Sequence, residues 1–213
     1  MDHLRDYVEW HQQYDDPSSS LSWRLAVVRN AIRTDLARRQ GPVRVASACA
    51  GDGRDVLGVL AEPGAPTAVA VTLLEVHPVL VARAADAAAV LPAGVTVEVR
   101  ELDAGVTDSW AGAVPADLVL LVGVLGNLAD DDITTVAQTL PQLCAAGATV
   151  VWTHGGGEEG RSAVARRAFR DMGCAETSYD VLPRASFPTV GAGRFEGEPQ
   201  PLAAGKRFFT MLQ

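Results

Sequence analysis

The chain has 213 residues, 48% hydrophobic and 21% charged, a balance typical of one globular domain that can bury a core without disulfide or metal support. Its formal net charge of −8 argues against a nucleic-acid partner, because such proteins need a basic face to contact phosphates. The charged amino terminus lacks a signal-peptide core, and no apolar stretch is long enough to span a membrane, so we expect a cytoplasmic protein without a membrane partner. Three widely separated cysteines predict neither a disulfide framework nor a metal site.

The hydrophobic pattern predicts helices that alternate with short buried strands. In chain order we expect a helix at 1–14, a serine-capped helix at 21–36, a strand at 43–48, a helix at 54–61, a strand at 68–74, a helix at 78–91, strands at 95–102 and 117–122, a helix at 130–145, a strand at 149–153, a helix at 161–172, and strands at 176–182 and 206–212. This order indicates an α/β fold, a doubly wound Rossmann-like sheet of seven mostly parallel strands with an antiparallel C-terminal strand. We expect one domain, with residues 1–41 as an N-terminal helical lid over a core at 42–213.

A glycine turn after the first predicted strand is the most informative motif. Gly51 and Gly53 follow the strand directly and open a helix, so the backbone can approach a ligand closely there. The second strand ends at Glu75, whose carboxylate can accept both hydroxyls of a ribose. A dinucleotide fold would place a third glycine three residues after Gly53, but Val56 stands there.

Several further residues extend this motif along the chain. Gly51-x-Gly53 followed by Arg54 and Asp55 resembles the first motif of class I S-adenosylmethionine-dependent methyltransferases. Glu75 and Asp103 match the acidic residues after the second and third strands of that family, residues 117–125 its fourth strand and loop, and residues 207–212 its final strand. The resemblance implies S-adenosylmethionine as cofactor and this set of contact residues: Ala50, Gly51, Gly53, Arg54, Asp55, Glu75, Val76, Asp103, Ala104 and Val122.

Two positions depart from the family pattern. Ser47 stands where the first strand of the family ends in an acidic residue, and Cys49 replaces the first glycine of the turn. The resemblance assigns the acidic residue to the methionine amino group, so another residue must serve there. Arg54, Asp55 and an N-terminal residue are the candidates.

A narrower resemblance covers residues 7–25 together with the turn at 49–55, which is similar to a group of small actinobacterial methyltransferases of natural-product pathways. It implies a small-molecule acceptor, such as indole C3 of a tryptophan-derived compound, and leaves a homodimer as an alternative assembly. His11, Tyr14 and His154 are the candidates to orient or deprotonate the acceptor, since an imidazole titrates near working pH.

Other interpretations of the same residues stay open at this stage. His11 and Tyr14 could simply pack a helix on the domain, and His154 could be hydrogen-bonded within its glycine-rich loop. His77 is interpreted as structural, and Asn127 as a helix cap or an acceptor contact. At the level of function, the alternatives are a non-catalytic S-adenosylmethionine-binding module, an NAD-dependent oxidoreductase, and a methyltransferase fold that carries out other chemistry such as cyclisation.

Overall fold

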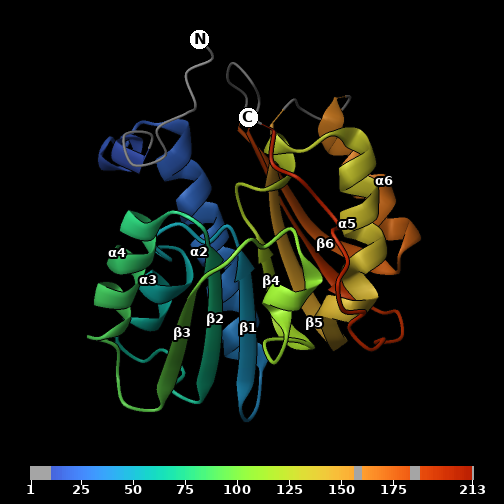
Figure 1. The fold of residues 1–213 in the computed structure, drawn as a ribbon. Coiled ribbons are helices and arrows are strands. Elements are labelled where there is room, and N and C mark those ends of the chain that lie inside the picture. Colours follow the sequence, from blue (N-terminus) through green and yellow to red (C-terminus); the bar gives the residue numbers. More distant parts are fainter. Residues whose placement is uncertain (1–10, 156–159, 183–187, 213) are drawn as a thin grey trace.

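A single seven-stranded sheet forms the centre of the chain in its computed structural model, which describes residues 11–155, 160–182 and 188–212 (Figure 1). The strand order is β3-β2-β1-β4-β5-β7-β6. Strand β7 is antiparallel to both of its neighbours, β5 and β6, and the pairs among β1 to β5 are parallel. The predicted doubly wound α/β sheet with an antiparallel strand near its C-terminus is therefore confirmed.

The elements follow the predicted order with small shifts at their ends. The strands are β1 (Val43–Ala48), β2 (Val69–Glu75), β3 (Val95–Glu101), β4 (Ala116–Leu121), β5 (Cys144–His154), β6 (Cys174–Val181) and β7 (Thr189–Phe195). The helices are α2 (Ser20–Arg38), α3 (Val56–Leu60), α4 (Pro78–Ala88), α5 (Asp130–Leu143) and α6 (Arg161–Asp171), with short 3-10 turns η1 (His11–Asp15), η2 (Thr107–Trp110) and η3 (Leu125–Asn127). No helix among the described residues has the length and apolar character needed to cross a membrane.

Helices cover both faces of the sheet, as Figure 1 shows, with α2, α3 and α4 on one face and α5 and α6 on the other. The side chains of β1 divide accordingly: Val43 and Val45 pack with the first group, and Ala46 and Ala48 with the second. Such alternation is the period-two pattern of a strand buried on both faces. Strands β2 and β3 are added on one side of β1, and β4 and β5 on its other side, so the carboxyl ends of the parallel neighbours β1 and β4 form the topological switch point.

Helix α2 is fixed at both of its ends. Ser19 caps its start, because the Ser19 hydroxyl accepts a hydrogen bond from the Ser22 amide at 3.0 Å. Near its end, the buried Asp35 carboxylate pairs with Arg39 at 2.6 Å and accepts the Thr149 hydroxyl of β5 at 2.6 Å. The helix is thereby held against the middle of the sheet, while its first turns reach the carboxyl edge.

The last strand is not where the sequence predicted it. Residues 206–212 make only one isolated bridge, between Val106 and Arg207, and the seventh strand is β7. Strand β7 contains two glycines, a residue type that is rare in strands, so propensity alone does not predict this strand. Close packing nevertheless requires both glycines. A Cβ on Gly191 would lie 2.2 Å from the Trp152 ring, and one on Gly193 would lie 2.6 Å from the Cys174 sulfur.

The predicted N-terminal helix lies partly outside the described residues, which begin at His11. The described end of that segment, His11–Asp15, is a 3-10 turn rather than an α-helix. It leads into α2, whose later residues Val28, Ile32 and Leu36 are buried in the core beneath the sheet.

Candidate active site

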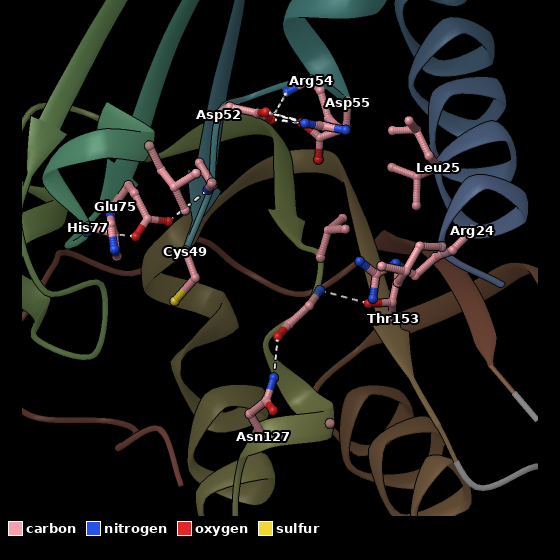
Figure 2. A pocket seen from close by; sticks show the side chains of 18 of the residues that line it. Arg24, Leu25, Cys49, Asp52, Arg54, Asp55, Glu75, His77, Asn127 and Thr153 are labelled. Carbon is pink, nitrogen blue, oxygen red and sulfur yellow. Dashed lines mark hydrogen bonds and ion pairs between the residues drawn. The ribbon is translucent and has the colours of Figure 1, made fainter. Parts of the chain in front are cut away.

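A cavity of about 700 Å³ opens at the switch point, above the carboxyl ends of β1, β2, β4 and β5. It is large enough for a nucleoside cofactor together with a small acceptor. Figure 2 shows Glu75 and His77 on one side of the cavity, Arg24 and Leu25 on the opposite side, and Asp52, Arg54 and Asp55 between them. The side chains come from segments far apart in the chain, and the parallel sheet brings them to one edge.

The turn after β1 forms the floor of the cavity. Cys49 has a φ of 47° and Gly51 a φ of 59°, both in the left-handed region that favours glycine. The Ala50 amide donates to the Leu74 carbonyl at 2.9 Å, so the turn follows the edge of β2. The family motif has a glycine at position 49, and the left-handed backbone conformation found here explains that preference. Cys49 adopts the same conformation at some cost in strain.

The Cys49 thiol lines the cavity but is a poor nucleophile. Burial raises its pKa to about 12, with further contributions from the negative charges of Glu75 and Asp103. A thiol with such a pKa is protonated at neutral pH, and the thiolate is the reactive form. Cys49 therefore contributes shape to the cavity rather than covalent chemistry.

Glu75 is held at the end of β2 by backbone donors. Its Oε2 accepts the Gly51 amide at 2.7 Å, and its Oε1 accepts the amides of Val76 and His77, each at 2.9 Å (Figure 2). A carboxylate offers about four lone-pair sites. Three amides therefore leave room for further donors, and the carboxylate is already oriented before a ligand arrives.

Asp103 lines the same cavity just after β3. Its Oδ1 accepts the Gly105 amide at 2.8 Å, and its Oδ2 forms an ion pair with Arg207 at 2.9 Å. Between the two carboxylates the apolar side chains of Val76 and Leu102 are exposed, 59% and 45% respectively, and both line the cavity. This end of the cavity thus combines two acceptor groups with a bare apolar surface, a combination suited to a purine nucleoside.

Charged and aromatic groups cluster at the other end. The Arg54 guanidinium pairs with Asp52 at 2.9 Å and lies 4.3 Å above the centre of the Tyr14 ring. Arg24 donates to the Tyr14 hydroxyl at 2.7 Å. Tyr14, from the segment before α2, is thereby fixed between two cations at the cavity wall.

The ends of β4 and β5 supply the remaining wall. The Gly123 amide donates to the Thr153 hydroxyl at 2.7 Å, and the Gly123 carbonyl accepts the Asn127 side-chain amide at 2.7 Å. His154 follows Thr153, is 7% exposed and lines the cavity. Its Nδ1 lies beside the Gly155 carbonyl.

Most of the residues expected at a cofactor or acceptor site do line this cavity: Tyr14, Ala50, Gly51, Arg54, Asp55, Glu75, Val76, Asp103, Ala104, Val122 and His154. Gly53 does not, because its α-carbon faces the core, where an added Cβ would lie 2.8 Å from both Leu57 and Leu73. The side chain of His11 lies outside the described part of the structure, so its assignment stays a prediction. Among the described residues no cluster of His, Cys, Asp or Glu could hold a metal ion.

Sequence reasoning missed Arg24, Asp52 and Met211, which also line the cavity. Arg24 belongs to a helix interpreted from its apolar positions alone, and Met211 lies in the segment expected to be a strand. Of these three residues, only Asp52 could have been predicted to line the cavity, because it lies within the glycine turn.

No protein-family model matches the sequence, and no curated protein matches it. Solved structures match its fold. The magnesium protoporphyrin IX methyltransferase ChlM from Synechocystis PCC 6803, with bound SAM, has a TM-score of 0.65 at 16% identity over 88% of this chain and 90% of that one. A protein described for the conversion of a disulfide bond into a thioacetal group during echinomycin biosynthesis has a TM-score of 0.56 at 22% identity over 81% of each chain. The [4+2]-cyclase SpnF has a TM-score of 0.56 at 14% identity over 88% of this chain and 85% of that one. The chain therefore has the Rossmann-like methyltransferase fold.

Proposed function

We propose that the chain is an S-adenosylmethionine-dependent methyltransferase that acts on a small-molecule acceptor. One observation carries the proposal: the carboxylates at the ends of two adjacent strands, Glu75 and Asp103, face one cavity beside the turn that follows β1. The fold agrees with this function, but it also occurs in the cyclase SpnF, so the proposal rests on the site.

The residues present fit the cofactor. Glu75 would accept the ribose hydroxyls, and Asp103 the adenine amine, while Val76 and Leu102 would cover the two faces or edges of the base. The left-handed turn at Cys49 and Gly51 brings backbone close to the cavity, as a bound nucleoside requires. When bound, the cofactor supplies a methyl group on a positively charged sulfur.

An NAD-dependent oxidoreductase is less compatible with the packing. In dinucleotide folds the third glycine lets the helix approach the strand closely. Here Val56 occupies that position and is fully buried in the core between α3 and the sheet. A valine at this position lacks the space that a glycine would leave for close helix–strand packing, so the motif favours a nucleoside without a pyrophosphate.

The chain's own residues then have to hold the acceptor and exclude water. Tyr14, fixed by Arg24 and Arg54, would orient the acceptor, and the His154 imidazole at the cavity wall would accept its proton. Apolar lining from Leu21, Leu25 and Met211 suits a flat apolar acceptor. Within the proposal, indole C3 of a tryptophan-derived natural product is the finer assignment, with the base acting on the indole N–H.

Two measurements test the proposal. Calorimetric titration with S-adenosylmethionine, S-adenosylhomocysteine and NAD should show binding of the first two only. Incubation with S-adenosylmethionine and mixtures of indole and other aromatic compounds, followed by mass spectrometry, should show products heavier by one methylene group. Binding of NAD alone would contradict the cofactor assignment, and cofactor binding without any methylated product would favour a non-catalytic module.

A further inference from the structure

The end of the cavity away from Glu75 carries side chains of both charge signs. Arg24, Arg54, Asp52 and Asp55 all line it (Figure 2). A cofactor whose nucleoside lies between Glu75 and Asp103 must direct its amino acid end to this region. That end bears a carboxylate and an ammonium, and burial of either charge without a partner is costly. The guanidinium groups of Arg24 and Arg54 suit the carboxylate of the cofactor. Its ammonium requires a carboxylate of the protein, either Asp52 or Asp55.

Asp55 is the carboxylate with an oxygen to spare. Its Oδ1 accepts the Val56 amide at 2.7 Å, while no other described residue donates a hydrogen bond to its Oδ2. The residue is 7% exposed and lines the cavity. Asp52, by contrast, uses both oxygens to bind the Arg54 guanidinium.

Ser47 leaves the end of β1 without an anion. It pairs in register with Leu73 and Leu120, is 1% exposed, and does not line the cavity. Its hydroxyl has no hydrogen-bond partner among the described residues, so it does not position a neighbouring polar group either. A ligand in the cavity therefore cannot pair with this position.

We propose that Asp55 binds the α-ammonium group of the cofactor, so that the negative charge paired with this group lies at the start of α3. The inference rests on the proposed function. Burial raises the pKa of Asp55 above its usual value, although the Val56 amide opposes this shift. A cationic ligand bound beside Oδ2 would stabilise the ionised carboxylate of Asp55. Ligand binding and ionisation of Asp55 would therefore favour each other.

The test separates the charge of Asp55 from its capping bond. Asp55→Asn and Asp55→Ser remove the charge and keep an oxygen that can accept the Val56 amide, whereas Asp55→Glu keeps the charge. Asp86→Asn removes a charge of the same sign from an exposed position on α4, outside the cavity, and serves as the matched control. Thermal unfolding establishes that each variant is folded before titration.

Three ligands are titrated calorimetrically: S-adenosylhomocysteine, its analogue without the α-amino group, and 5′-methylthioadenosine, which lacks the whole amino acid. We expect Asp55→Asn and Asp55→Ser to weaken S-adenosylhomocysteine by about 10- to 100-fold, the effect of one charge-assisted hydrogen bond. Binding of the other two ligands should change less than threefold, and Asp55→Glu should restore part of the loss. The Asp86→Asn protein should bind all three ligands as the unmodified protein does.

Equal binding of S-adenosylhomocysteine to the Asp55→Asn and unmodified proteins would overturn the inference while leaving the proposed function intact. So would an equal loss for the analogue that lacks the amino group, because the effect would then not depend on the ammonium. If the unmodified protein binds none of the three ligands, the proposed function itself fails, and this inference fails with it.

Discussion

Replacement of Glu75 by alanine should remove cofactor binding more completely than any other single change. The carboxylate would accept two ribose hydroxyls, and each charge-assisted hydrogen bond contributes about 1.5–3 kcal/mol. Loss of both therefore costs about 3–6 kcal/mol, which corresponds to a drop in affinity on the order of 10²- to 10⁴-fold. The same change leaves the Gly51 amide without its 2.7 Å acceptor in a buried turn, so the free energy of unfolding should fall by about 1–3 kcal/mol.

Calorimetry with S-adenosylhomocysteine and urea denaturation measure the two effects separately. Glu75→Gln keeps one acceptor oxygen. Its affinity for S-adenosylhomocysteine and its free energy of unfolding should both lie between those of the unmodified and Glu75→Ala proteins. Glu101 is the matched control, because it pairs in register with Glu75 on β3 and is exposed outside the cavity. Glu101→Ala should bind normally. A folded Glu75→Ala protein that binds within threefold of the unmodified protein would refute the reasoning.

Four further changes have defined outcomes. His154→Ala should leave S-adenosylhomocysteine affinity within about threefold and slow methyl transfer by about 10²-fold, measured by product mass; normal turnover would remove His154 from the mechanism. Asp35→Ala leaves the Arg39 guanidinium without its buried partner and should lower the free energy of unfolding in urea by about 3 kcal/mol. Gly191→Ala forces a Cβ against the Trp152 ring and should cost about 2 kcal/mol in the same assay. Because burial raises the pKa of Asp55, its ionised form opposes folding; Asp55→Asn should therefore be more stable than the unmodified protein at pH 7, and the difference should shrink as pH falls through the raised pKa towards the ordinary value. A difference that grows on acidification would contradict this sign.

The period of the hydrophobic residues predicted most of the fold, because the central strands are buried on both faces and the helices on one. Residues 43–48, for example, form β1 as expected. The final strand was predicted wrongly for a reason of packing. Phe208 and Phe209 give residues 206–212 the apolar character of a strand, yet both rings are buried, Phe208 against Trp110 and Phe209 against Phe208, and the segment pairs with Val106 through one bridge.

The carboxylates of the site were predictable because each follows a strand, and the carboxyl ends of parallel strands meet at one edge. The residues of the opposite cavity wall were not predictable. Their identity depends on how α2 and the C-terminal segment cross the carboxyl edge of the sheet. Arg24 reaches the cavity from the first turns of α2, and Met211 reaches it because the Leu212 amide is bound to the Asn127 carbonyl at 2.7 Å. Gly53 differs from the other expected cofactor contacts, because it does not line the cavity and packs closely against Leu57 and Leu73.

A crystal structure of the protein with S-adenosylhomocysteine tests the central claim most directly. The account predicts the ribose hydroxyls within hydrogen-bond distance of the Glu75 carboxylate, the adenine amine beside Asp103, and the sulfur above the turn at Cys49. Density for the nucleoside in another part of the molecule, or a ligand in this cavity that touches neither carboxylate, would contradict it.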